Sequence, residues 1–253
     1  MIRTIVWLIY VVIVCIINVP YVLYWKFKGG KKPGDRYQAP QNVVNTFVPS
    51  VYKLGGMVLH KKGEENIIED RPALYVGNHQ GDFDIFIIAK ELGSLKSIVA
   101  KKESGKVPVV KNYMEYADCI FMDRGNPRQT LQSINRAQEL LESGRSVVIF
   151  PEGTRSRGPE MNEFKAGALR CALRAGVPIV PFAIDGTYKV YEQQKYLKKA
   201  DVNLSILPAV ETAGMEKERT KTISAEIQQM IQDELYNMRG GCPEGERKIW
   251  TNQ

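Results

Sequence analysis

Short runs of β-branched residues alternate with amphipathic segments along the chain beyond residue 70. Parallel strands need long crossover connections, usually helices, so this alternation predicts an α/β fold with a mostly parallel central sheet flanked by helices. The predicted strands are Ala73–Gly77, Ser97–Ala100, Cys119–Met122, Ser146–Phe150, Ile179–Ile184 and Val202–Leu207. The predicted helices are Asp82–Leu92, residues 127–143, Phe164–Ala175 and Thr222–Met238. In such sheets, ligands bind beyond the carboxyl ends of the strands.

The helix that follows the third predicted strand has the best-defined boundaries. Asn126 is a favourable N-cap residue, Pro127 suits the first helical position, and Gly144 suits the C-terminal end. The apolar side chains recur at helical spacing, and these are Leu131, Ile134, Ala137, Leu140 and Leu141. This face is expected to pack on the sheet.

The N-terminal segment from Thr4 to Trp25 contains no charged residue. A helix of that length reaches about 30 Å, the thickness of the hydrocarbon core of a bilayer. Lysines follow directly in the stretch Lys26–Arg36, which favours a cytoplasmic position for the rest of the chain. Asn18 and Pro20 interrupt the apolar run, so a straight span and a bent helix pair in one leaflet both fit the pattern. A cleaved signal peptide is disfavoured, because the apolar run is too long and no small-x-small cleavage site follows it.

These patterns divide the chain into three parts. Residues 1–56 are predicted to form membrane-associated helices with a basic linker, including a second helix over Gln41–Leu54. Residues 57–239 form the α/β domain, and residues 240–253 form an irregular tail. The expected location is the cell membrane, or another membrane that faces the cytosol, with the α/β domain on the cytoplasmic side.

Charge and cysteine content limit the classes of partner. The net charge of +7 over 253 residues favours a negatively charged partner, such as anionic membrane lipid or a phosphorylated small molecule. Nucleic acid is not expected, because no run of interleaved basic and aromatic residues is present. The cysteines are scattered at Cys15, Cys119, Cys171 and Cys242. Their spacing predicts neither a disulfide framework nor a metal site.

The stretch that follows the first predicted strand contains His79 and Asp84. A carboxylate close to a histidine can hold one ring nitrogen, so that the other nitrogen can remove a proton from a hydroxyl. The chain contains neither a Gly-x-Ser-x-Gly elbow nor a P-loop. The pattern therefore predicts a general base that acts on a hydroxyl of the substrate.

Further polar residues follow other predicted strands. Glu152-Gly153-Thr154-Arg155 comes directly after an apolar strand and combines a glycine turn, a hydroxyl and a guanidinium, which suit a phosphate monoester. Arg124 follows another strand, although Asp123 can pair with it. Lys101 and Lys165 are weaker candidates for the same binding role. Because the carboxyl ends of parallel strands share one edge, these groups are expected to lie together.

These residues resemble the 1-acylglycerol-3-phosphate acyltransferase family, within the wider glycerolipid acyltransferases. The first family block resembles Asn78 through Asp84, with His79 and Asp84 in the His-x4-Asp positions. The second resembles the stretch CIFMDR, in which Arg124 takes the position of the basic residue that binds the acceptor.

The third family block is similar to Phe150–Ser156, FPEGTRS, and is the most specific of the four. The fourth resembles Val177–Ile184, which in the family helps shape the acyl-donor side. Order and spacing agree over Leu74–Asp185. The chain departs from the family at Gly81 and Asp82, where the family more often has a serine and a bulky residue.

The resemblance implies transfer of an acyl group from acyl-CoA or acyl-carrier protein to the free hydroxyl of lysophosphatidic acid, giving phosphatidic acid in phospholipid biosynthesis. No cofactor and no metal are implied. His79 and Asp84 would be catalytic. The substrate-binding residues would be Asn78, Lys101, Arg124, Glu152, Gly153, Thr154, Arg155 and Lys165. Two alternatives stay open, which are an acyltransferase for another lysolipid and a non-catalytic membrane-bound binder of lipid phosphate.

Overall fold

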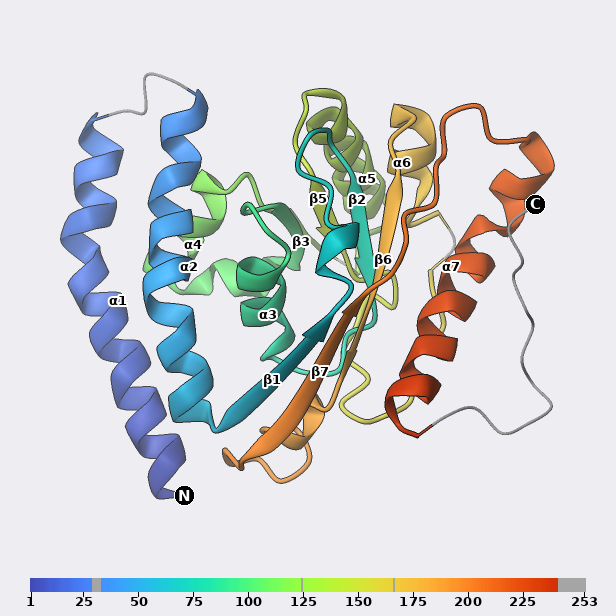
Figure 1. The fold of residues 1–253 in the computed structure, drawn as a ribbon. Coiled ribbons are helices and arrows are strands. Elements are labelled where there is room, and N and C mark those ends of the chain that lie inside the picture. Colours follow the sequence, from blue (N-terminus) through green and yellow to red (C-terminus); the bar gives the residue numbers. More distant parts are fainter. Residues whose placement is uncertain (29–32, 124, 166, 241–253) are drawn as a thin grey trace.

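The chain folds around one seven-stranded sheet with helices on both faces (Figure 1). The computed structural model describes residues 1–28, 33–123, 125–165 and 167–240. The strands are β1 (Met57–Lys62), β2 (Leu74–Gly77), β3 (Ser97–Lys101), β4 (Ile120–Met122), β5 (Val147–Ile149), β6 (Ile179–Asp185) and β7 (Ala200–Ile206). The helices are α1 (Ile2–Lys28), α2 (Pro33–Gly55), α3 (Asp84–Glu91), α4 (Pro108–Tyr116), α5 (Pro127–Glu142), α6 (Arg170–Ala175) and α7 (Lys217–Met238). The predicted α/β fold is confirmed.

The strand order is β1-β7-β6-β2-β5-β3-β4. Neighbouring strands are parallel except for β6 and β7, so β1 and β7 run against the other five. The sequence did not predict β1, because its second half, His60–Lys62, is polar and exposed at the sheet edge. The three strands β6, β2 and β5 are adjacent at the centre, which brings the ends of three separate parts of the chain together.

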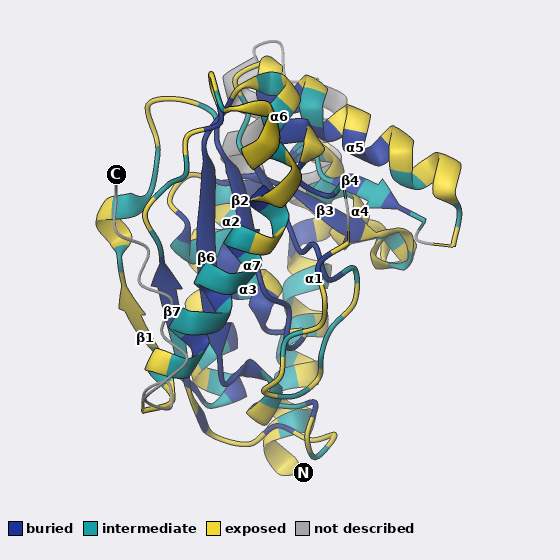
Figure 2. Cartoon of the chain, turned by 90° about the vertical axis from the view of Figure 1, so that its right-hand side faces the viewer, coloured by how far each residue is buried: buried dark blue, intermediate teal, exposed yellow. Residues whose placement is uncertain are grey.

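Each face of the sheet has its own apolar core. Helices α5, α6 and α7 cover one face, and α2, α3 and α4 lie on the other (Figure 1). On α7 the buried residues recur every four positions, and these are Ile223, Ile227, Ile231 and Leu235. Figure 2 shows β2 and β6 as buried strands behind α6 and α7. Burial on both faces explains why the central strands are apolar along most of their length rather than at alternate positions.

Several predicted boundaries were wrong by a few residues, and one helix was missed. The missed helix is α4, which is only nine residues long and has no buried residue, so it lacks the long apolar face by which the other helices were predicted. Helix α6 is shorter than the predicted Phe164–Ala175, because turns occupy the residues before Arg170, including Gly167 with φ of 85°. The predicted cap of α5 is confirmed, since the Asn126 side chain accepts hydrogen bonds from the backbone at N2 and N3.

Helices α1 and α2 lie antiparallel, side by side, as a hairpin (Figure 1). Helix α2 begins at Pro33 rather than at the predicted Gln41, so it includes part of the predicted linker. Residues 29–32 of that linker and residues 241–253 of the predicted tail lie outside the described residues. Helix α1 continues through Pro20. The Asn18 side chain donates to the carbonyl of Val14 and accepts from the hydroxyl of Tyr113 at 2.8 Å, which ties α1 to α4.

One face of α1 packs on the domain and the other is exposed and apolar. The Trp7 ring lies 5.7 Å from the ring of Phe83, centroid to centroid, and its Nε1 donates to a carbonyl of α2. The exposed side carries Ile5, Leu8, Ile9, Val12, Ile16 and Ile17. Over Ile2–Pro20 the helix is long and apolar enough to cross a membrane. An apolar pocket of about 340 Å³ lies where the hairpin meets α3 and α4.

Candidate active site

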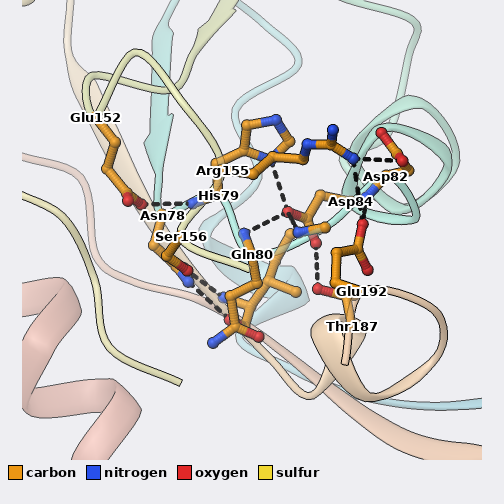
Figure 3. Close-up of polar contacts among 12 residues, drawn as sticks. Asn78, His79, Gln80, Asp82, Asp84, Glu152, Arg155, Ser156, Thr187 and Glu192 are labelled. Atoms are coloured by element: carbon orange, nitrogen blue, oxygen red, sulfur yellow. Dashed lines mark hydrogen bonds and ion pairs between the residues drawn. The ribbon is translucent and has the colours of Figure 1, made fainter. Parts of the chain in front are cut away.

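The turn after β2 holds a buried histidine–aspartate pair. His79 Nδ1 lies 2.7 Å from Asp84 Oδ2 (Figure 3). The same oxygen accepts the backbone N–H groups of Gln80 and Gly81, at 2.7 and 2.9 Å, and Oδ1 accepts the hydroxyl of Thr187 at 2.6 Å. These donors keep a fully buried Asp84 side chain in one orientation. Nδ1 is therefore engaged, and Nε2 is the nitrogen that can take a proton from a substrate.

The His79 ring is also fixed by packing. It stacks on the ring of Phe150, with centroids 4.2 Å apart and planes 15° from parallel. The backbone carbonyl of His79 accepts the N–H of Ser156 at 2.8 Å, so the loop after β5 holds the turn as well. A ring fixed by a carboxylate at one nitrogen and an aromatic face has little freedom to leave the position needed for proton transfer.

Glu152 supports His79 from the end of β5. Its Oε1 accepts the backbone N–H of His79 at 2.7 Å (Figure 3). Its Oε2 accepts both the backbone and the side-chain N–H of Asn162 at 2.8 Å. Burial raises the pKa of Glu152, although these N–H groups oppose the increase. Glu152 was predicted to bind substrate; it lines the pocket described below, and its contact with the backbone of His79 also makes it a positioning residue for the histidine.

The variant Glu152→Gln tests this positioning role. A glutamine must direct its amide NH₂ group at a backbone N–H, either that of His79 or that of Asn162. One hydrogen bond is then replaced by a contact between two donors, in a site where an unsatisfied group costs about 1–3 kcal/mol. We expect the midpoint of thermal unfolding to fall and kcat to decrease about tenfold, as measured by circular dichroism and by initial rates. Unchanged kcat in the folded variant would show that the contact does not position the base.

Two buried amides fasten the turn to β6. Asn78 donates to the carbonyl of Ile184 and accepts its N–H, each at 2.8 Å. Gln80 donates to Asp185 and accepts the N–H of Gly186 at 2.9 Å. Both amides have their polar atoms occupied by protein, so Asn78, which was predicted to bind substrate, lies in the framework of the turn.

A pocket of about 470 Å³ is lined in part by Phe150 and Glu152, two residues that contact His79. Its apolar wall is formed by Val99, Met122, Leu131, Ile134 and Ile149. Its polar rim is formed by Gly153, Thr154, Lys165, Arg170 and Arg174. Apolar and basic surfaces thus meet in one cavity, which suits a ligand with a hydrocarbon chain and an anionic group.

The other predicted binding residues take different places. Lys101 ends β3, is exposed and lies 3.6 Å from a carboxylate oxygen of Glu103, outside the lining of the pocket. Arg124 lies outside the described residues. Arg155 forms ion pairs with Asp82 and with Glu192 (Figure 3). The distance from Arg155 Nη1 to Glu192 Oε1 is 3.3 Å. The structure therefore brings Gly153, Thr154 and Lys165 to the pocket, and Arg155 to the turn that carries the histidine.

Sequence reasoning missed Thr187, Phe150 and Glu192 as parts of the site. Thr187 follows β6, so the rule that polar residues collect at the carboxyl ends of strands was sufficient to find it. Phe150 reads as the last apolar residue of a strand. Glu192 lies in a segment with no recognisable pattern, and only the folded chain brings it to Asp82 and Arg155.

Comparison with known proteins agrees with this geometry. The family model described as acyltransferase matches residues 58–185, which contain the turn, the pair and the rim of the pocket. A probable 1-acyl-sn-glycerol-3-phosphate acyltransferase of Mycoplasma genitalium is 37% identical over 166 residues, covering 61% of this chain and 62% of that protein. A 1-acyl-sn-glycerol-3-phosphate acyltransferase of Haemophilus influenzae is 26% identical over 80% of this chain and 85% of that protein.

The fold is shared with a solved structure. The crystal structure of the 1-acyl-sn-glycerophosphate acyltransferase PlsC from Thermotoga maritima matches with a TM-score of 0.76, covering 94% of this chain and 98% of that chain at 24% identity. The matched region spans a little under two thirds of the mycoplasma relatives, 62% and 61% of their length. Because the family model covers half of the chain and includes the buried His79–Asp84 pair, this chain belongs to the acyltransferase family.

Proposed function

We propose that the protein transfers a fatty acyl group from a thioester, acyl-CoA or acyl-carrier protein, to the free hydroxyl of lysophosphatidic acid. The product is phosphatidic acid. The observation that carries this proposal is the His79–Asp84 pair, held at 2.7 Å, whose contacts Phe150 and Glu152 line a pocket with apolar and basic residues. The names of the relatives from Mycoplasma genitalium and Haemophilus influenzae point to the same acceptor.

The reaction needs one base and no nucleophile from the protein. His79 Nε2 takes the proton of the acceptor hydroxyl while the oxygen of that hydroxyl attacks the carbonyl carbon of the thioester. The tetrahedral intermediate then expels the thiolate, and the imidazolium returns the proton to that sulfur. Asp84 stabilises the imidazolium while it exists. Base catalysis of this kind contributes about 10²–10⁴-fold, so binding both substrates in the correct orientation supplies the rest of the rate enhancement.

An assay of the purified protein against a panel of lysolipids tests the proposal. Each lysolipid is offered with acyl-CoA and with acyl-carrier protein as donor, and product is measured by mass spectrometry. We expect phosphatidic acid to form fastest. Faster acylation of a lysolipid with another headgroup would show that this lysolipid is the preferred acceptor, and the proposed chemistry would be unchanged. No acylation of any lysolipid with either donor would refute the proposed function.

Arg155 is proposed to bind the phosphate of the acceptor. A hydrogen bond to a charged group contributes about 1.5–3 kcal/mol, so Arg155→Ala is expected to lower kcat/KM for lysophosphatidic acid at least about tenfold. The loss with an uncharged monoacylglycerol should be smaller. Initial rates at varied acceptor concentration measure both values. An equal loss of kcat/KM with the two acceptors would show that Arg155 stabilises the structure or binds the acyl donor instead.

The helical hairpin is proposed to hold the domain on the membrane surface. Contacts from Thr4 to Asn18 tie α1 to the α/β domain, since Thr4 accepts the N–H of Leu197 and Asn18 contacts α4. A helix that packs along the domain in this way cannot cross a bilayer without carrying the domain into it. The exposed apolar side of α1 therefore favours insertion into one leaflet, which gives the site access to a membrane-resident acceptor.

Replacing three exposed residues of α1 tests this anchor without disturbing its packed side. The variant Ile9→Ser, Val12→Ser, Ile16→Ser removes apolar side chains that each contribute about 1.5–3 kcal/mol when fully buried. We expect binding to vesicles of anionic lipid to weaken about 100-fold or more in a sedimentation assay. Transfer to acceptor in bilayers should fall more than transfer to a short-chain soluble acceptor.

The matched control is Val58→Ser, which removes an exposed apolar residue from the edge strand β1. It should bind vesicles like the wild type. If the triple variant keeps full vesicle binding, the hairpin is not the anchor. If it loses activity equally on both acceptors, the exposed side of α1 supports the fold rather than the membrane contact.

A further inference from the structure

Arg155 lies between two carboxylates of different character (Figure 3). The side chain of Asp82 is 62% exposed, whereas that of Glu192 is 2% exposed. Arg155 itself is 27% exposed, so the guanidinium can be reached from solvent on the side of Asp82. One partner of the arginine is therefore open to exchange and the other is enclosed by protein.

Glu192 is the fixed partner. Its Oε1 accepts the backbone N–H of Asp82 at 2.7 Å in addition to Arg155. Its Oε2 has no hydrogen-bond partner among the described residues and faces Gly81, where an added Cβ would lie only 2.6 Å away. Glu192 thus holds the backbone of the turn and the arginine together, and the absence of a side chain at Gly81 makes room for it.

The charge of this cluster bears on how an anion can bind. Arg155 contributes one positive charge, and the paired carboxylate of Asp82 balances it; Glu192 adds a further negative charge when ionised, although burial raises its pKa. An approaching phosphate therefore meets no net attraction as long as Asp82 remains paired. A phosphate monoester carries about −1.5 to −2 charges and accepts two parallel hydrogen bonds from arginine. It can therefore compete with the single carboxylate of an exposed residue, but not with a buried one.

We infer that the Asp82 carboxylate is a replaceable partner of Arg155 and that the phosphate of the acceptor displaces it from the guanidinium. Glu192 stays in place and orients the arginine. Asp82 is then a specificity residue, because an acceptor without an anionic headgroup has nothing to exchange for it. This inference rests on the proposed function, in which the acceptor carries a phosphate monoester.

The variant Asp82→Asn tests the exchange. Exposed ion pairs are weak, so removing the competitor is expected to lower KM for lysophosphatidic acid about two- to fivefold. KM for a monoacylglycerol should not fall. The matched control is Glu139→Gln, which removes an equally exposed carboxylate, 62%, from an ion pair with Arg136 on α5. That control should leave KM for both acceptors unchanged.

Two further variants separate exchange from a general effect of charge. In an Arg155→Ala background, Asp82→Asn should no longer lower KM, because no arginine is left to release. Glu192→Gln removes the same charge as Asp82→Asn but takes the fixed partner from the arginine. It is expected to raise KM for lysophosphatidic acid, whereas simple relief of repulsion would lower KM in both variants.

The outcomes distinguish this inference from the proposed function. Wild-type protein that acylates no lysophosphatidic acid refutes the proposed function. Wild-type protein that does so, with an unchanged or higher KM in Asp82→Asn, overturns only the exchange. A lower KM that persists without Arg155, or that appears equally with Glu192→Gln, also overturns it, since the effect then comes from net charge alone.

Discussion

Replacing His79 with alanine is expected to lower kcat for acyl transfer about 10²–10⁴-fold, the usual contribution of a positioned base. The reason is the geometry of the ring, whose Nδ1 is held 2.7 Å from a buried Asp84 carboxylate, which leaves Nε2 for the substrate hydroxyl. Single-turnover rates with saturating donor and acceptor measure the chemical step. Circular dichroism and the midpoint of thermal unfolding check that loss of the stacking on Phe150 has not unfolded the domain.

The chain offers a matched control for this variant. His60 forms a second histidine–aspartate pair, with Nε2 2.9 Å from Asp201 Oδ1, but both side chains are exposed, on the edge strand β1 and on its neighbour β7. His60→Ala should retain the wild-type rate. Nearly full activity of a folded His79→Ala protein, or an equal loss in His60→Ala, would exclude His79 as the general base.

Asp84→Asn is expected to lower kcat about 10- to 100-fold, because the imidazolium formed in the reaction keeps a hydrogen-bond acceptor but loses the negative charge that stabilises it. In serine proteases the same change costs about 10⁴-fold, because the histidine adopts the wrong tautomer. Here the N–H groups of Gln80 and Gly81 require an oxygen at the position of Oδ2, and the hydroxyl of Thr187 can accept from the amide NH₂ group. The asparagine therefore still presents an acceptor to His79, and only its charge is lost.

The comparison variant is Asp84→Ala, which leaves those buried donors without an acceptor. Each unsatisfied group costs about 1–3 kcal/mol, so this variant should lose stability as well as activity. Chemical denaturation together with single-turnover rates separates the two effects. A loss of 10⁴-fold in a fully stable Asp84→Asn protein would show that the backbone donors do not control the orientation of the amide.

The sequence by itself determined the fold class, the boundaries of α5 and the identity of the buried pair. The alternation of strands and helices was predicted from the spacing of apolar residues within short stretches of the sequence. The cap at Asn126 and the pairing of His79 with Asp84 both connect residues within one turn of chain. Such features depend on the spacing of residues close together in the chain, so they can be predicted from the sequence alone.

The tertiary structure alone decided the roles of the residues around that pair. Glu152 reaches His79 across 73 positions of sequence, and Thr187 reaches Asp84 across 103. Glu192 contacts Asp82 across 110 positions. These contacts exist because β6, β2 and β5 are neighbours at the centre of the sheet, and that order results from the burial of apolar faces over the whole domain rather than from any local pattern.

The orientation of β7 and the presence of β1 have the same origin. Strand β7 pairs antiparallel with β6, and β1 then pairs parallel with β7, joining Met57 to Ala200. The direction of each of these strands is set by the neighbour with which it pairs, β6 for β7 and β7 for β1. Local sequence can specify that a segment is extended, but long-range pairing and the packing of both sheet faces decide where that segment lies and what its side chains contact.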